Sequence, residues 1–456
     1  MAIDFFSITL YVACLVFMGL LSTRLMKIFH LPNVTGYIIA GILMGPFVFG
    51  LAFVDWSQVH EFADIANPSL NPIYVYIHGQ NGGPDYLSWV SDIALGFIAF
   101  SIGSSFKLSA IRSVGKRVLW ITVLESGLAS ICVILGLLCL HFIFPDQVDM
   151  PLVLTLGAIA AATAPAATLM VVKQYKAKGP VVSTLLPVVA LDDATALIFF
   201  AILFQIAKTI ATGGGFDLYE MLAKPFIEII MSLGIGAVFG FIISLASRFF
   251  KSRANRLGWA VFAIFASVGL YKLFRLPQVG GFELSSLLMC MMTGAIYCNV
   301  GKDSIKLFEF LDRFTSPIYM LFFMISGASL DLTVFSKGYI VLLIAAVYLL
   351  TRVIGKWIGA FAGAEITHAE PTVKKYLGFT LVPQAGVAIG LATSASTLFG
   401  ESGNPEIHAI GATIVAVVLT STLVYELTGP FITKIALTKA GEIPLEPSKS
   451  SPNVSH

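Results

Sequence analysis

The segment that most constrains the fold runs from Leu185 to Phe204, LLPVVALDDATALIFFAILF. It is long enough to cross a bilayer, because about 20 apolar residues span the hydrocarbon core. Two adjacent carboxylates, Asp192 and Asp193, lie at its centre with no basic residue nearby in the same segment. A charge at that depth costs about 3 kcal/mol on insertion scales, and a like charge beside it adds to the cost. The pair therefore predicts an ion pathway or a proton relay; a structural pair satisfied by a neighbouring helix is the alternative.

The composition indicates a polytopic membrane protein. Of 456 residues, 57% are apolar and only 12% are charged, whereas soluble domains have about 25% charged residues. The formal net charge of +2 is too small to indicate a nucleic-acid partner. The five cysteines have no CxxC spacing, and most of the seven histidines fall in loops or at span ends. We therefore expect neither an enzyme nor a protein with a bound cofactor.

Apolar runs of about 20 residues predict thirteen spans, and hence an all-α membrane protein. The external loop 53–88 lacks Lys and Arg and is expected to include a short surface helix, with no function assigned to it. The tail 441–456 is rich in Pro and Ser and is expected to be disordered. The predicted spans are 5–23, 34–52, 89–106, 118–144, 151–172, 181–207, 225–247, 257–271, 281–299, 315–330, 338–364, 376–399 and 407–433.

The distribution of basic residues predicts the orientation. If the N-terminus lies outside, the cytoplasmic loops and tail hold 21 of the 28 Lys and Arg residues, and the external loops hold five. The remaining two, Arg352 and Lys356, lie inside a span. Because cytoplasmic loops of membrane proteins are enriched in Lys and Arg, this asymmetry supports an odd number of spans and a cytoplasmic C-terminus. We expect a multi-pass protein of the cell (inner) membrane.

Two spans are interrupted near the middle of the membrane. The fifth, GAIAAATAPAATLMVV, contains Pro165 next to Thr163, and the twelfth, TLVPQAGVAIGLATSAS, contains Pro383, Gln384 and Gly386. Non-helical backbone at this depth is tolerated only where protein buries it or it lines a wet cavity. Breaks at matching positions in two halves of six spans, with the seventh span as linker, predict an inverted-repeat transporter. The alternative is that Pro and Gly are simply common in membrane helices.

The eleventh span supplies basic side chains that are candidates to balance the carboxylates. Arg352 and Lys356 are four residues apart and share one helix face. A buried lysine needs a counter-charge, so the simplest arrangement pairs Lys356 with one of the two aspartates and leaves the other free. The alternative is that Lys356 extends to the cytoplasmic surface. Arg352 more often makes a structural contact at such a position, and Glu125 or Glu426 are the candidates to balance it.

At these residues the chain resembles the monovalent cation:proton antiporter superfamily, specifically the second cation:proton antiporter family, which includes bacterial-type Na⁺/H⁺ exchangers. The resemblance covers nearly the whole membrane region. A double aspartate followed by a helical lysine is its most specific combination. The motifs that carry it are TGYIIAGILMGP (35–46), ATAPAAT (162–168), LDD (191–193), SGASLDL (326–332) and RVIGKWIG (352–359).

The resemblance implies a fold with two crossed broken helices and an elevator-type homodimer. By residue match, Asp193 is the principal cation and proton carboxylate, and Asp192 pairs with Lys356, a combination associated with electrogenic exchange. Two departures matter, because positions that carry charges in some relatives hold Ala164, Gln384 and Gly386 here. The implied division is 1–106 and 251–336 for the dimer-domain helices, 107–211 and 337–440 for the core-domain helices, and 212–250 for the linker helix.

Together these features predict a secondary antiporter that exchanges Na⁺, or else Li⁺ or K⁺, for H⁺. Sodium is a hard cation and prefers oxygen ligands, which Asp193, Asp192 and the break at Thr163 can supply. Bound cation and proton would compete for the same carboxylates. A sodium-coupled symporter of organic solutes is an alternative with the same architecture, as is a K⁺/H⁺ antiporter. An intramembrane aspartyl protease fits poorly, because it needs its two aspartates on facing helices.

Overall fold

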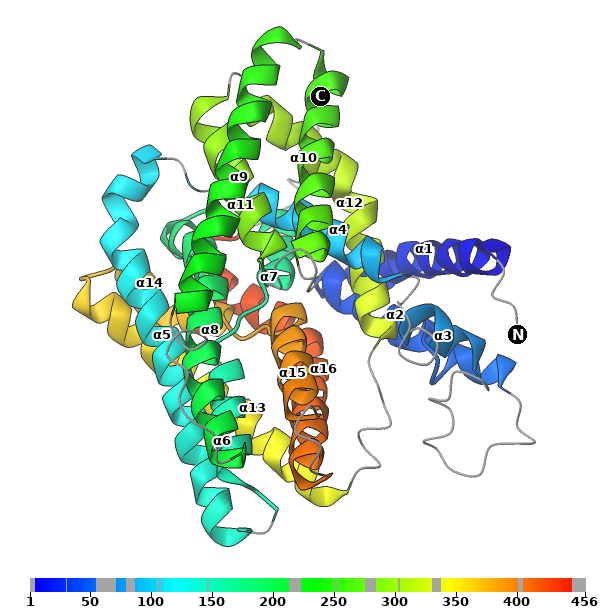
Figure 1. The fold of residues 1–456 in the computed structure, drawn as a ribbon. Coiled ribbons are helices and arrows are strands. Elements are labelled where there is room, and N and C mark those ends of the chain that lie inside the picture. Colours follow the sequence, from blue (N-terminus) through cyan, green and yellow to red (C-terminus); the bar gives the residue numbers. More distant parts are fainter. Residues whose placement is uncertain are drawn as a thin grey trace, which may run out of the picture.

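The structure is a computed structural model, and its regular elements are helices throughout the part of the chain that it describes (Figure 1). The described residues are 5–29, 31–54, 71–78, 87–104, 106, 108–145, 147–212, 223–250, 252–274, 284–301, 304–329, 338–400 and 405–444. The helices are α1 (Phe5–Ile28), α2 (Asn33–Met44), the 3-10 helix η1 (Phe49–Phe53), α3 (Pro72–His78), α4 (Ser88–Gly103), α5 (Leu108–Ile143), α6 (Met150–Ile159), α7 (Pro165–Gln174), α8 (Pro180–Thr212), α9 (Lys224–Phe249), α10 (Arg253–Phe274), α11 (Ser286–Val300), α12 (Ser304–Ala328), α13 (Tyr339–Ile366), α14 (Pro371–Thr380), α15 (Gly386–Gly400) and α16 (Pro405–Lys439).

The helices account for every predicted span. In the described part of the chain, eight helical segments are long and apolar enough to cross a membrane, and four shorter apolar helices accompany them. Each predicted span coincides with one α-helix, except that the fifth and the twelfth each coincide with two consecutive short α-helices. The end of the second span, beyond α2, contains the 3-10 helix η1. The order is therefore six spans, then α9, and then six more spans. The predicted all-α membrane fold is confirmed.

The helices pack as two groups. We call α1–α4 and α9–α12 the scaffold group, because their side chains form most of one large apolar cluster, to which α7 and α8 add a few residues. We call α5–α8 and α13–α16 the core group, which builds two further clusters. In Figure 1, α1 and α2 lie on the opposite side of the molecule from α5. The assignment of these groups to a dimer domain and a core domain stays a prediction.

Two non-helical segments meet inside the core group. The first joins α6 to α7, and the second joins α14 to α15. Pro165 opens α7, where its missing N–H breaks no helical hydrogen bond. The Ala164 N–H donates to the carbonyl O of Pro383 at 2.9 Å, so the two segments touch through their backbones. These are the crossed breaks that the sequence predicts.

Two expectations about the loops need correction. The helix α3 does lie within the loop 53–88, but Ile73, Val75 and Ile77 are buried, so it packs into the scaffold group instead of lying on the surface. The rest of that loop falls outside the described residues. Of the tail 441–456, the structure describes residues 441–444, and these are ordered: both carboxylate oxygens of Glu442 accept from N–H groups in the first turn of α8, at 2.6 and 2.9 Å. A carboxylate stabilises a helix N-terminus in this way, since the first N–H groups have no helical acceptor. The rest of the tail lies outside the described residues.

The contact between α5 and α13 depends on glycines at four-residue spacing. A Cβ at Gly355 or Gly363 would lie 2.6 Å from the Cα of Ala129 or Ile121 in α5, and one at Gly359 would overlap the backbone of Glu125. Small residues at such spacing allow membrane helices to approach closely. This approach brings the side chains of α5 next to those of α13 beside the crossing.

We expect Gly359→Val to destabilise the protein by about 1–3 kcal/mol, since overpacking forces neighbouring backbones apart. The measurement is the apparent melting temperature of the purified protein in detergent. Gly234→Ala is the matched control, because a Cβ at this helical glycine of α9 meets no atom within 4 Å. An unchanged melting temperature for Gly359→Val would show that α5 and α13 can separate without loss.

Candidate ion-binding site

Charged side chains from three core-group helices meet beside the crossing. Asp192 of α8 and Lys356 of α13 are completely buried, and their Oδ2 and Nζ atoms are 3.1 Å apart. The Lys356 ammonium also donates to the carbonyl O of Ala161 in the first break, at 2.5 Å. Glu125 of α5 is equally buried, and its Oε2 lies 2.6 Å from Lys356 Nζ. The structure thus brings Asp192 to Lys356, and it adds a second carboxylate to the same lysine.

The other oxygen of Asp192 is held by hydroxyl groups. Ser126 Oγ donates to Asp192 Oδ1 at 2.5 Å, and Thr195 Oγ1 lies 3.3 Å from the same oxygen. Ser126 Oγ also lies 3.1 Å from Glu125 Oε1. Both oxygens of Asp192 therefore have partners in this arrangement, and the carboxylate is held in place from two sides.

Asp193 differs from Asp192 both in its exposure and in its hydrogen bonding. Its side chain is 6% exposed, and its Oδ1 has no hydrogen-bond partner within the described part of the chain. The hydroxyl of Thr163, in the first break, is also buried; it lies near Asp192, but no described residue makes a hydrogen bond of good geometry with it. Buried polar atoms are usually hydrogen-bonded, so each unpaired atom needs an explanation, such as an ion or a water. The two residues offer oxygen atoms of the kind that a hard cation prefers.

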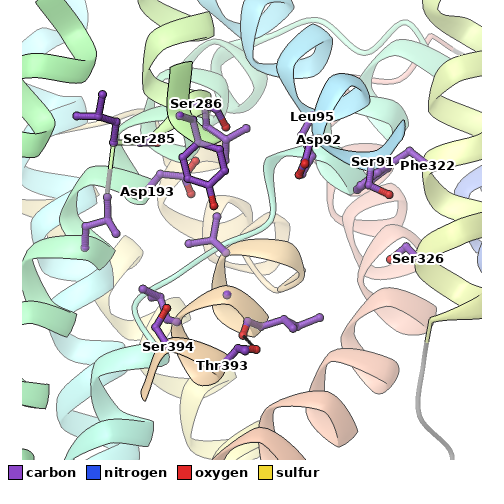
Figure 2. Close-up of a pocket in the computed structure, with 18 of the residues that line it drawn as sticks. Ser91, Asp92, Leu95, Asp193, Ser285, Ser286, Phe322, Ser326, Thr393 and Ser394 are labelled. Carbon is purple, nitrogen blue, oxygen red and sulfur yellow. Dashed lines mark hydrogen bonds between the residues drawn. The ribbon is translucent and has the colours of Figure 1, made fainter. Parts of the chain in front are cut away.

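Asp193 reaches a cavity of about 580 Å³ between the two helix groups. Figure 2 shows its lining side chains around a common space, with contributions from α4, α11 and α12 of the scaffold group and from α8 and α15 of the core group. Asp92 also lines it and forms an ion pair with Lys272 at 2.6 Å. Hydroxyl groups make much of the remaining polar surface, from Ser91, Ser285, Ser286, Ser326, Ser329, Thr393 and Ser394.

Arg352 is completely buried and holds the crossing from one side. Its guanidinium lies over the ring of Tyr425, 4.8 Å from the ring centre. Three backbone carbonyl groups accept its hydrogen bonds, namely those of Ala160 at 3.0 Å, Ala162 at 2.6 Å and Val382 at 2.8 Å. These carbonyls follow the C-terminal ends of α6 and α14, which carry partial negative charge. The crossing lacks charged residues of its own, and α13 supplies the compensating positive charge through Arg352 and Lys356.

The prediction that Glu125 or Glu426 balances Arg352 is wrong. Glu125 contacts Lys356 instead. Glu426 is buried, and Ser326 Oγ lies 3.1 and 3.0 Å from its two carboxylate oxygens. The physical reason is that a guanidinium presents a planar fork of donors, which three converging carbonyl groups can occupy. Glu426 thus joins α16 of the core group to α12 of the scaffold group.

Gln384 connects the two breaks. Its Nε2 donates to the carbonyl O of Ile159 at 3.1 Å, and its side chain pairs with the hydroxyl of Tyr348 at 2.9 Å. Gly386 begins α15, and Pro383 provides the carbonyl that accepts from the opposite break. The break residues singled out in the sequence therefore shape the backbone of the crossing, and they lie beside the charged cluster.

Several residues of the site went unnoticed in the sequence. Ser126 and Thr195 hold Asp192, and Tyr348 orients Gln384. Thr195 lies three residues after Asp192, so helix spacing alone could have suggested it. Ser126 and Tyr348 come from other helices, and nothing in a single sequence distinguishes them from other polar residues in spans.

Comparison with known proteins places this geometry in context. Residues 12–436 match the family described as sodium/hydrogen exchanger, transmembrane. The Na⁺/H⁺ antiporter NhaS4 of Synechocystis is 24% identical over 80% of this chain and 82% of its own length. The ammonium/H⁺ antiporter subunit AmhT of Alkalihalophilus pseudofirmus is 22% identical over 71% of this chain and 78% of its own.

Solved structures show the same fold. The sodium proton antiporter MjNhaP1 of Methanocaldococcus jannaschii at pH 8 superposes with a TM-score of 0.65 at 16% identity, over 96% of this chain and 99% of its own. A second structure of that protein, from electron microscopy, gives 0.72 at 15% identity, over 97% and 100%. The predicted antiporter fold, with its crossed broken helices, is confirmed.

Proposed function

Because the chain belongs to the sodium/hydrogen exchanger family, we propose that it exchanges Na⁺ for H⁺ across the membrane and that Asp193 carries both ions in turn. The family and the curated relatives make it a multi-span membrane protein of the cation:proton antiporter class, and these relatives are transporters rather than enzymes. The observation that supports Asp193 is its unpaired oxygen at the edge of the cavity.

Competition at one carboxylate is enough to couple the two ions. Ionised Asp193 binds Na⁺ together with the Thr163 hydroxyl, break carbonyls and water from the cavity. Protonated Asp193 has lost the charge that holds the cation. The N-terminal ends of α7 and α15 begin near the crossing, and their partial positive charge helps to hold the carboxylates when no cation is bound. Since both ions need the same group, neither can cross in the same step as the other.

The different surroundings of Asp192 and Asp193 favour electrogenic exchange. Asp192 is fixed by Lys356 and Ser126, so it keeps its charge close to Asp193 without facing the cavity. More than one proton per cation then requires a second group in the buried cluster to change its charge. We expect the rate of exchange in proteoliposomes to depend on the imposed membrane voltage. A rate that is independent of this voltage would mean that one proton is exchanged per Na⁺.

The cavity supports an elevator movement of the core group against the scaffold group. It opens between the two groups, and its lining residues lie near the ends of α4, α11 and α12 that the distribution of Lys and Arg places outside. The structure then corresponds to an outward-open state. We place the protein in the cell (inner) membrane, with its C-terminus in the cytoplasm. We propose a homodimer formed by the scaffold groups, which predicts twice the chain mass of 49.0 kDa for the protein in detergent.

The test uses purified protein in liposomes that contain a pH-sensitive dye and carry an imposed pH gradient. Na⁺, Li⁺, K⁺ and NH₄⁺ are added in turn, and we expect the largest pH change with Na⁺. A larger response to K⁺ or NH₄⁺ would leave the antiport mechanism in place and change its cation. No response to any of them would favour the sodium-coupled symporter, since a cavity of about 580 Å³ also has room for a small organic solute.

A further inference from the structure

Two buried carboxylates share one lysine in this protein. Lys356 Nζ lies closer to Glu125 Oε2, at 2.6 Å, than to Asp192 Oδ2, at 3.1 Å. All three side chains are completely buried. An ion pair of Lys356 with Asp192 alone would be neutral, whereas the observed set carries one negative charge in excess when all three groups are ionised.

The position of Glu125 is fixed by the backbone as well as by its charge. It lies on α5 directly opposite Gly359, where a Cβ would overlap the backbone of Glu125 itself. Its Oε1 lies 3.1 Å from Ser126 Oγ, the hydroxyl group that donates to Asp192. Glu125 therefore contacts Lys356 directly, and it is connected to Asp192 through the hydroxyl group of Ser126.

We propose that Glu125 is a positioning residue for transport, which draws the Lys356 ammonium toward α5 and offsets its charge, so that Asp192 and Asp193 together attract the cation. This inference rests on the proposed exchange of Na⁺ at Asp193. Without Glu125, the ammonium would neutralise Asp192 and its positive charge would act on the cation bound next to it. Charges inside a protein act over such distances with little screening.

Glu125→Gln is the first variant to measure, because it has nearly the same shape and can still pair with Ser126 and Lys356 through its amide. We expect the KM for Na⁺ in proteoliposomes to rise by roughly tenfold, which corresponds to the loss of one nearby charge, while kcat changes little. Glu125→Asp keeps the charge and should keep the KM closer to that of the wild type. A purely structural role would instead lower the amount of active protein, and with it the maximal rate.

Glu426→Gln is the matched control, since it also neutralises a buried glutamate that accepts a hydrogen bond from a serine. It lies outside the charged cluster and should leave the KM for Na⁺ unchanged. The double variant Glu125→Gln with Lys356→Gln provides a second test. If Glu125 acts through Lys356, replacing Glu125 should have no further effect on the KM once the lysine is gone.

Binding can be followed without transport, as the rise in apparent melting temperature of detergent-solubilised protein with Na⁺ concentration. This keeps the test informative for variants that fold but do not exchange ions. An unchanged KM and an unchanged Na⁺ dependence of melting in Glu125→Gln would overturn the inference while leaving Na⁺/H⁺ exchange intact. Failure of the proposed function looks different, because the wild type itself would then show no cation-induced pH change.

Discussion

Asp193→Asn is expected to reduce the Na⁺-induced pH change in proteoliposomes to the level of protein-free liposomes. Asparagine matches aspartate in shape but can neither carry a proton at this position nor hold a cation by charge. The wild-type carboxylate lines the cavity, and its Oδ1 has no hydrogen-bond partner among the residues that the structure describes. We also expect Na⁺ to lose its effect on the melting temperature of this variant. The melting temperature without Na⁺ should not fall, because Asp193 forms no ion pair with any residue that the structure describes.

Two further variants define the specificity of that result. Asp92→Asn removes the carboxylate that lines the cavity and pairs with Lys272. The side chain of Asp92 is 30% exposed and that of Lys272 is 49% exposed. Exposed ion pairs contribute at most about 1 kcal/mol to stability, so Asp92→Asn should fold normally. We expect its exchange rate to change by less than about fivefold. Asp192→Asn should unfold more readily, since it leaves Lys356 with one carboxylate fewer. If Asp193→Asn still exchanged ions, while Asp192→Asn folded but did not, the cation-binding carboxylate would be Asp192 and not Asp193.

The fold could be predicted from the sequence because the membrane makes each span visible on its own. A run of apolar residues has to cross as a helix whatever surrounds it, so the thirteen spans follow from hydropathy and length. The two breaks were visible for the same reason, since Pro165 and Pro383 interrupt otherwise regular spans. The ordered contact of Glu442 with α8 was missed because composition describes a tail and says nothing about a single residue that caps a helix.

The site could be predicted only as far as individual residues differ from their surroundings. Charged side chains inside spans are rare enough to stand out, and this identified Asp192, Asp193, Arg352 and Lys356. Which of them pair depends on how neighbouring helices are rotated about their axes, and a single sequence does not contain that information. For this reason the sequence offers Glu125 only as one of two candidates to balance Arg352, whereas in the structure it contacts Lys356. The carbonyl groups that surround Arg352 belong to the backbone and leave no trace in the sequence.

Arg352→Gln is expected to have the largest effect on stability. The wild-type guanidinium donates to the carbonyls of Ala160, Ala162 and Val382, and so holds both breaks with one side chain. Hydrogen bonds from a charged group contribute about 1.5–3 kcal/mol each, and a buried carbonyl left without a donor costs about 1–3 kcal/mol. Glutamine is shorter and can reach one of the three carbonyls at most. We expect a loss of at least about 3 kcal/mol, seen as a clear fall in the apparent melting temperature.

Arg352→Lys separates charge from geometry. Lysine keeps the positive charge at the ends of α6 and α14, but an ammonium group lacks the planar fork that reaches three carbonyls at once. We expect its melting temperature to lie between those of the wild type and Arg352→Gln. Arg256→Gln is the control, because Arg256 of α10 also donates to two carbonyls, those of Ser247 in α9 and of Phe250 just after it, away from the crossing. If Arg352→Gln abolished transport while its melting temperature stayed unchanged, the guanidinium would serve the crossing by its charge alone, and the breaks would be held together by their own backbone contact between Ala164 and Pro383.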